Sequence, residues 1–359
     1  MNHRHHAPNV RCHFLTMHTL APATAKLAPP WWCGAGYCAL GADRLASVEL
    51  PSSLQRMVQL GASAIWLQTA PEGQAPGNLQ AAIALAHTLG LKVIVELALL
   101  TPHTACPEAL RVALRHAVHW KVDAVSLQTC TSPSTRALAP AVYAQVGAAA
   151  GLVLLGAPGD PRTTADAGVS KNRLRWLSTV DVPSATLADL HAPVLHSQIR
   201  QALRTAGPAA IVWNTTPPCP HSRTPAPPDR TMPAQSRYIA PALFSCLQGA
   251  FRMDIHTVGP GCSAQDQFRR FLQWQSELVV FQRGKLKLLP SHKHLFAFTR
   301  TADNAAVLCV FNLSDRYVRH RLPVHCQGAS LLAGSGFQGG RIVDEHLDLD
   351  PWGALFARF

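Results

Sequence analysis

The residues of this chain that could do chemistry stand at or near the ends of short apolar runs, and one of these runs ends without an acid. The run Val122–Thr129 closes on Gln128 and Thr129. Asp160 follows a later apolar run, and Asp181 and Asp254 lie within others. Carboxylates in such places act as nucleophiles or as general acids and bases, whereas a neutral amide is a far poorer nucleophile. What these residues can do therefore depends on the elements that position them.

Apolar runs alternate with amphipathic helical patterns from residue 34 onward. The expected strands cover residues 34–40, 64–69, 92–99, 124–129, 151–157, 175–182, 209–216 and 251–259, and the expected helices cover 50–61, 78–90, 107–121, 135–150, 194–206, 239–250 and 265–278. Strand–helix units in this number, over about 240 residues, are typical of an α/β protein with a (β/α)₈ TIM barrel. A doubly wound open sheet would alternate similarly, but its glycine fingerprint is absent from the sequence.

The pattern changes after residue 285 to short strands and turns, at 295–300, 305–314, 316–323 and 340–349. Such a pattern predicts a small antiparallel β-domain. We therefore expect three regions: a flexible His-rich leader over residues 1–30, a barrel over 31–284 and a C-terminal β-domain over 285–359.

Composition limits the class of protein. With 48% hydrophobic and 14% charged residues, the chain is globular rather than disordered. Its formal net charge of +12 is strongly basic, but the Arg and Lys residues are scattered, so we expect no nucleic-acid partner. A basic module that binds nucleic acid or acidic polymers stays an alternative, and it would bind less tightly as salt rises. No run of 18 apolar residues occurs, which predicts no membrane span.

The cysteines and histidines point to no metal or cofactor. Several of the ten cysteines, such as Cys246 and Cys309, lie inside apolar runs and fit a reducing compartment, so we expect a cytoplasmic protein. Cys33 and Cys38 have no second pair nearby to complete a zinc site. The His-rich leader could bind a divalent metal weakly, although a flexible segment is the simpler interpretation.

Four segments together resemble one known family. They are "WWCGAGY" (31–37), "LQRMVQLGASAIWLQ" (54–68), "LAHTLGLKVIVELAL" (85–99) and the stretch 268–314. In their order and spacing they are similar to the alpha-amylase superfamily of glycoside hydrolases, in particular to its bacterial alpha-glucosidase and oligo-1,6-glucosidase type. The resemblance implies a barrel that acts on α-glucosides or malto-oligosaccharides.

Two segments of that family have no counterpart here. The long loop after the second strand is nearly absent, and only "LTPHTAC" (100–106) stands where the family inserts a subdomain after the third strand. That subdomain forms one wall of the family's sugar cleft. The resemblance therefore implies a truncated cleft subdomain and a wide, shallow site that binds ligand weakly.

The resemblance also implies where three catalytic carboxylates should stand, at the ends of the fourth, fifth and seventh strands. A retaining glycosidase needs a nucleophile and an acid/base about 5–5.5 Å apart. Gln128 occupies the nucleophile's position, Ala157 that of the acid/base and Thr216 that of the third carboxylate. Ser126 replaces the family's Arg, while Asn214 is kept. We therefore predict no catalytic residues in this chain.

Other acids could restore hydrolysis only if together they replaced all of the missing catalytic carboxylates. Asp123 lies five residues before Gln128, at the wrong end of the barrel. Asp160, Asp181 and Asp254 are expected to be surface or loop-capping acids. Glu96, where the family has Asp, is expected to form a buried ion pair with Lys92 rather than to act as a catalyst. His103 is a displaced candidate for a family His.

Three aromatic residues and Asn214 are the candidate substrate-binding residues. Tyr37, Trp66 and Trp213 would stack on sugar rings if they reached the open end of the barrel, and would otherwise belong to the core. We therefore expect a carbohydrate-related pseudoenzyme, with weak sugar binding or a scaffold role, or a decayed gene product. The alternative is a residual glycoside hydrolase that uses relocated acids. The oligomeric state is left open by the sequence.

Overall fold

The structure, a computed structural model, describes residues 30–68, 78–97, 107–127, 142–143, 145–146, 151–156, 176–181, 191–206, 211–214, 236–253, 263–290, 292–337 and 339–359. Within it, Trp31–Phe359 forms one compact unit. Eight parallel strands close into a barrel in the order β1 to β8, with β1 also paired to β8. The predicted TIM barrel is therefore confirmed.

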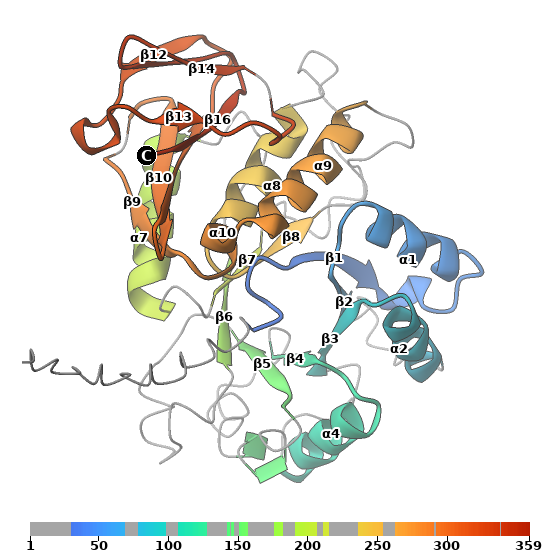
Figure 1. Ribbon diagram of the computed structural model, residues 1–359. Coiled ribbons are helices and arrows are strands. Elements are labelled where there is room, and N and C mark those ends of the chain that lie inside the picture. The colour runs from blue at the N-terminus through green and yellow to red at the C-terminus, as the bar shows by residue number, and fades with distance from the viewer. Residues whose placement is uncertain are drawn as a thin grey trace, which may run out of the picture. The chain divides into compact units, whose positions relative to one another are not determined.

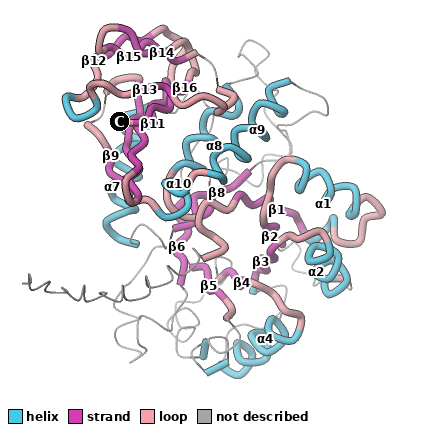
Figure 2. The backbone as a smooth tube through the Cα atoms, in the orientation of Figure 1, coloured by secondary structure: helices cyan, strands magenta, loops and turns pink. Residues whose placement is uncertain are grey.

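The barrel strands follow the predicted runs closely but are shorter at several ends. They are β1 (Gly36–Gly41), β2 (Ala64–Gln68), β3 (Lys92–Glu96), β4 (Ala124–Ser126), β5 (Val153–Gly156), β6 (Trp176–Asp181), β7 (Ile211–Asn214) and β8 (Ala250–Met253). The helices are α1 (Leu50–Gln59), α2 (Leu79–Thr88), α4 (Pro107–His119), α7 (Ala192–Ala206), α8 (Ser236–Cys246), α9 (Ser263–Glu277) and α10 (Val279–Arg283). Figures 1 and 2 show the helices outside the ring of strands.

Alternate residues of each strand face the two sides of the barrel wall. Inward-facing side chains form one apolar cluster: Trp32, Ala35, Tyr37, Ala64, Trp66, Ile94, Ala124, Val153, Leu155, Leu177, Val212 and Ala250. The side chains between them, such as Val93, Val125, Trp213 and Phe251, belong to a larger cluster under the helices. This alternation fixes which residues can meet inside the barrel.

The segment between β3 and α4 is short. β3 ends at Glu96 and α4 begins at Pro107, which leaves no room for an inserted subdomain. This agrees with the predicted truncation of the cleft subdomain.

The C-terminal part of the chain forms two antiparallel sheets. The first has the order β13 (Ser330–Leu331), β16 (Ala354–Arg358), β11 (Ala305–Asn312), β10 (Leu295–Ala302) and β9 (Lys285–Leu288). The second has the order β12 (Val318–Arg321), β15 (His346–Leu349) and β14 (Gly340–Val343). The predicted run 340–349 divides into a hairpin at Asp344 and Glu345, which both have positive φ, as a two-residue hairpin turn requires.

The first C-terminal sheet shares its core with the helices of the barrel. Phe356 of β16 lies 5.5 Å from Phe271 and 5.1 Å from Trp274 of α9, measured between ring centroids. Arg300 of β10 is fully buried, and its guanidinium donates to the carbonyl oxygens of Cys246 (2.7 Å) and Phe281 (2.8 Å). The expected division at residue 284 stays a prediction. None of the helices in the described part of the chain is long and apolar enough to cross a membrane.

Candidate functional site

The carboxyl ends of the barrel strands carry a polar layer above the apolar interior. Continuing the inward alternation from the cluster residues reaches Glu96 on β3, Ser126 on β4, Thr179 on β6, Asn214 on β7 and Arg252 on β8. The first four of these residues are buried and Arg252 is half-buried. In TIM barrels this end holds the active site, so we call these five residues, with Tyr37 and Trp66, the inner polar layer.

Asn214 is the centre of the contacts within the inner polar layer. Its Oδ1 accepts a hydrogen bond from Nη1 of Arg252 at 3.2 Å and a long one from the hydroxyl of Tyr37 at 3.5 Å. Strands β7, β8 and β1 bring these three residues together, and Tyr37 lies directly opposite Arg252 in the β1–β8 register. A neutral amide between a cation and a phenol can orient both side chains toward a ligand.

Two side chains in the same interior have a polar atom without a hydrogen-bond partner. Nε1 of Trp66, 1% exposed, and Oγ1 of Thr179, 0% exposed, make no hydrogen bond in the described structure. The Trp66 ring packs on Tyr37 with centroids 5.3 Å apart. A buried polar atom without a partner costs free energy, so a polar group beside either atom would be favoured.

Tyr37, Trp66 and Trp213, the three candidate sugar-stacking residues, are all buried. This is what we expected if they belonged to the core. Tyr37 and Trp66 lie inside the barrel within the inner polar layer. Trp213 instead faces the helices, where its Nε1 donates to the carbonyl of Gln248 at 2.8 Å and its ring packs against Phe244. Of the predicted substrate-binding residues, the structure thus brings together Tyr37, Trp66 and Asn214, and places Trp213 outside the barrel wall.

The expected ion pair between Glu96 and Lys92 does not form. Lys92, at the first position of β3, donates to Oδ1 of Asp123 at 2.8 Å, and Asp123 Oδ2 lies 3.0 Å from Nε2 of His87. Glu96 is four residues further along the strand, about 13 Å away at the usual rise. Asp123 therefore lies at the amino ends of the strands, as predicted, while Glu96, 4% exposed, belongs to the inner polar layer.

The remaining predicted site residues lie outside the described residues. These are Gln128, Ala157 and Thr216 at the family's catalytic positions, together with Asp160, Asp254 and His103. For Asp181 the backbone alone is described, paired with Asn214 across β6 and β7.

The sequence pattern alone does not single out Arg252 and Thr179. It predicts strands over residues 251–259 and 175–182, but it does not show which of their residues face the interior. Strict alternation from a buried Ala250 or Leu177 would have placed both side chains in the interior.

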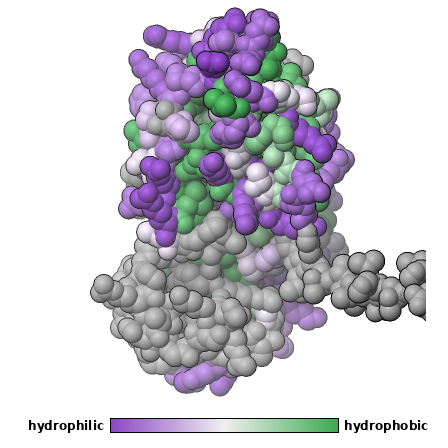
Figure 3. Space-filling view, turned by 60° about the vertical axis from the view of Figure 1, so that its left-hand side comes forward, coloured by the Kyte–Doolittle hydropathy of each residue, from purple (hydrophilic) through white to green (hydrophobic). Residues whose placement is uncertain are grey.

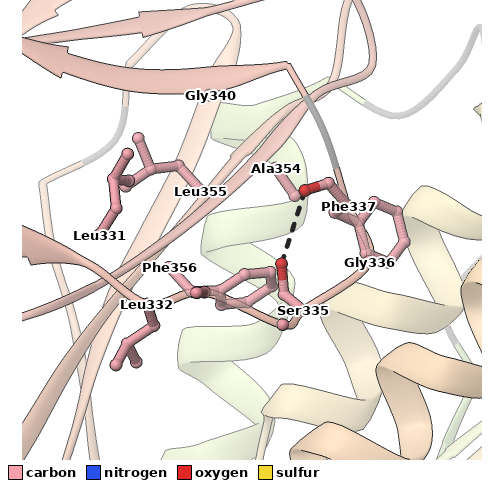
Figure 4. A pocket seen from close by; sticks show the side chains of 11 residues that line it. Leu331, Leu332, Ser335, Gly336, Phe337, Gly340, Ala354, Leu355 and Phe356 are labelled. Carbon is pink, nitrogen blue, oxygen red and sulfur yellow. Dashed lines mark hydrogen bonds between the residues drawn. The ribbon is translucent and has the colours of Figure 1, made fainter.

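Two surface pockets lie among the described residues away from the inner polar layer. A cavity of about 400 Å³ is lined by residues 331–337, Gly340 and residues 354–356, and its walls are mostly apolar, as Figure 4 shows. A polar pocket of about 220 Å³ is lined by Asp43, Arg44 and Glu49. Figure 3 shows a face on which hydrophilic side chains predominate, with smaller hydrophobic areas between them. The described residues include no group of three or more His, Cys, Asp or Glu side chains that could hold a metal ion.

Comparison with known proteins supports the predicted resemblance. No protein-family model matches the sequence. A probable alpha-glucosidase from Rhizobium meliloti is 32% identical over 100 residues, which are 28% of this chain and only 18% of that relative.

Solved structures match the whole fold at low sequence identity. An alpha-glucosyl transfer enzyme, XgtA, superimposes with a TM-score of 0.68 at 14% identity, over 92% of this chain and 99% of that one. An alpha-amylase from Geobacillus thermoleovorans, solved with acarbose, gives a TM-score of 0.65 at 13% identity, over 91% and 98% of the two chains. The chain thus has the same fold as these solved structures and, over 100 residues, is similar in sequence to a probable alpha-glucosidase.

Proposed function

We propose that this protein is a carbohydrate-binding relative of the alpha-glucosidases that has lost glycosidase turnover. The observation that carries the proposal is that Gln128, Ala157 and Thr216 stand where the resemblance implies the three family carboxylates. Without a nucleophile and a proton donor, neither step of retaining hydrolysis has its reacting group. Catalytic groups act as a unit, so the loss of all of them leaves no basis for ordinary turnover.

The inner polar layer supports a remaining role in binding. Tyr37, Asn214 and Arg252 form a hydrogen-bonded group at the end where barrel proteins bind ligands. The names of the similar proteins point to α-glucosides and malto-oligosaccharides as the ligand class. The missing cleft subdomain favours weak binding, because an open site buries little of a ligand. Five described cysteines are free, which supports a cytoplasmic location.

The test separates binding from hydrolysis. Purified protein is incubated with p-nitrophenyl α-glucoside and maltose, and release of nitrophenol and glucose is followed. Maltose binding is measured in parallel by calorimetry. We expect hydrolysis at the buffer rate and millimolar binding that weakens in Asn214→Ala. Turnover above the buffer rate would refute the loss of catalysis, and an absence of maltose binding would refute the binding role.

A residual hydrolase with relocated acids is the second candidate, and one observation favours it. Glu96 is a buried carboxylic acid of the inner polar layer, on the strand next to Ser126 of β4. Asp160 and Asp254 would have to supply the other groups. Glu96→Gln and Asp160→Asn would each abolish activity under this hypothesis, with Glu108→Gln as a control because Glu108 is an exposed acid of α4. Equal rates in all variants would exclude it.

A further inference from the structure

Three charged side chains form a row across the second C-terminal sheet, which lies at the top of Figure 2. Asp348, in the middle strand β15, stands directly opposite Arg319 of β12 and directly opposite Arg341 of β14. Residues that face each other across neighbouring antiparallel strands have their side chains on the same face of the sheet. Leu347 and Leu349, on either side of Asp348 along β15, belong to an apolar cluster on the other face. The row therefore lies on the face that is turned away from the core.

The two arginines of the row are accessible to solvent, whereas the acid between them is buried. The side chains of Arg319 and Arg341 are 50% and 67% exposed, and that of Asp348 is 4% exposed. The phenol of Tyr317 lowers the pKa of the Asp348 carboxyl, and Arg341 and Arg319 lower it further, against the opposing effect of burial. Asp348 is therefore ionised, and the row carries two positive charges and one negative charge.

Both arginines contact Asp348 through Nε alone. Nε of Arg341 donates to Oδ2 at 3.2 Å, and Nε of Arg319 lies 3.7 Å from Oδ1, which makes no hydrogen bond. In the strongest arginine–carboxylate pairs, two parallel N–H groups of the guanidinium meet the two carboxylate oxygens. Within the described part of the chain, the terminal Nη atoms of these two arginines have no carboxylate partner. One buried acid thus holds two guanidiniums and leaves their terminal N–H groups available to another oxyanion.

A phosphate group suits this pair of arginines better than a carboxylate does. A phosphate ester has three strongly accepting oxygens and between one and two negative charges, so both guanidiniums can donate to it at once. A carboxylate has two oxygens, which a single guanidinium already satisfies. Arg321, the next arginine on the same face, has Glu345 at 3.5 Å from its Nη2, so its charge is already paired.

We propose that Arg319 and Arg341 form a binding site for the phosphate group of a small molecule, with Asp348 as the residue that positions both guanidiniums. The ligand reaches the two arginines directly from solvent, because both side chains are exposed. The site belongs to the second C-terminal sheet, and it does not depend on the proposed function of the barrel.

The experiment titrates the full chain with different anions at matched ionic strength. The probes are inorganic phosphate, α-glucose 1-phosphate, chloride and a short DNA duplex. The readout is the ¹⁵N–¹H signals of the arginine Nε groups at mildly acidic pH, which Arg319→Lys and Arg341→Lys assign. We expect both signals to shift together and to saturate at millimolar phosphate or phosphate ester, but not with chloride. The tighter of the two phosphate compounds shows whether the natural source is an ester or free phosphate.

Variants separate the guanidinium geometry from the charge. Arg319→Lys and Arg341→Lys each keep the positive charge beside Asp348 but lose the planar group, so each should weaken phosphate binding about tenfold. Arg269→Lys, at an exposed arginine of α9 that pairs with Asp266, is the matched control and should leave binding unchanged. Asp348→Asn should weaken binding although it makes the row more positive, because the two guanidiniums lose their common partner. Circular dichroism verifies that each variant is folded.

Four results would overturn the proposal. The first is a titration with phosphate that shows no saturation, and the second is a shift as large with chloride as with phosphate, which would reflect screening alone. The third is an equal loss of affinity in Arg269→Lys and in the two site variants. The fourth is a DNA duplex that shifts the same two signals and binds far more tightly than both phosphate compounds, because the ligand would then be a nucleic acid. Stronger phosphate binding in Asp348→Asn would overturn the positioning role of Asp348.

Discussion

At the scale of one residue, Asp123 is an acid whose contacts join several elements of the fold. Its carboxylate accepts from Lys92 Nζ at 2.8 Å and from the backbone N–H of Val93 at 2.9 Å, and His87 Nε2 lies at 3.0 Å. These contacts tie β4, β3 and α2 at the amino ends of the strands, which in TIM barrels is the stability face.

We therefore expect Asp123→Ala to destabilise the protein without changing ligand binding. The variant leaves a half-buried N–H and a lysine without their partner, at a cost of about 1–3 kcal/mol. Urea denaturation followed by circular dichroism measures the loss. Glu108→Ala is the matched control, because its pair with Arg111 is exposed and should contribute below about 1 kcal/mol. Equal losses in the two variants would contradict this view of Asp123.

Residue roles could be predicted from the sequence only where a pattern constrained them. The resemblance located Asn214, and distance along the strand located Asp123 at the amino end. Lys92 was assigned the wrong partner, because reasoning along one strand cannot see Asp123 on the neighbouring one. Trp213 and Trp66 were equivalent by composition, and only the register shows that one faces the helices and the other the interior.

At the scale of elements, one glycine allows β8 to lie beside β7. Gly249 has φ +99°, and a Cβ there would stand 2.1 Å from the carbonyl oxygen of Ile211, the first residue of β7. Its own carbonyl accepts from Gly34 N–H, just before β1. The closure of the barrel, and with it the position of Arg252, depends on this close approach.

Gly249→Ala should therefore cost more than backbone strain alone. Gly328 is the matched control, because it also has positive φ (+80°) but nothing within 4 Å of an added Cβ. Gly328→Ala should lose about 1–2 kcal/mol, the strain of the left-handed conformation, and Gly249→Ala clearly more. Thermal denaturation of both variants tests this, and equal melting temperatures would contradict it.

A histidine cluster beside β12 of the second C-terminal sheet is expected to make stability depend on pH. His320 of β12 lies with its ring 4.8 Å from that of His292, and His294 lies 6.3 Å from His292. Burial, followed by His292 and His346, lowers the pKa of His320. Burial, followed by Lys293, His292 and Arg316, lowers the pKa of His294, against a smaller opposing effect of Asp315.

Because both pKa values are lower in the folded chain than in the unfolded chain, unfolding takes up protons. Stability from this source is complete above the ordinary histidine pKa of about 6.5 and falls as the pH falls below it. We expect the urea midpoint to be lower at pH 5.5 than at pH 7.5, and the difference to shrink in His320→Gln. His119→Gln, in α4, is the control, and an unchanged difference in His320→Gln would refute the prediction.

Elements were easier to predict than residues, for a physical reason. The barrel strands are buried on both faces, so they appear in the sequence as continuous apolar runs. In the helices between them, apolar residues recur with the helical period. Short strands at sheet edges, such as β9 with "KLKL" and β13 with two residues, carry no such signal and were missed. β16 was also missed, because it follows a turn at the very end of the chain.

At the scale of the whole molecule, the barrel and the first C-terminal sheet share one core. The cluster under the helices includes Phe271 of α9, Phe298 of β10, Phe311 of β11 and Phe356 of β16. We expect one unfolding transition for residues 31–359, because neither the barrel nor the sheet alone can exclude water from this cluster. Tryptophan fluorescence, which reports mainly on the barrel, and far-ultraviolet circular dichroism should give coincident urea curves. Two separate transitions would contradict the shared core and support independent domains.

Arg300 has a consequence for the order in which the chain can fold. Its guanidinium donates to the carbonyls of Cys246, the last residue of α8, and Phe281, within α10, from a strand that is made later. During synthesis the barrel sequence leaves the ribosome first, but those two carbonyls have no buried partner until residue 300 has also emerged. We therefore expect the last helices of the barrel to reach their native packing only after the strand that carries Arg300 has been made.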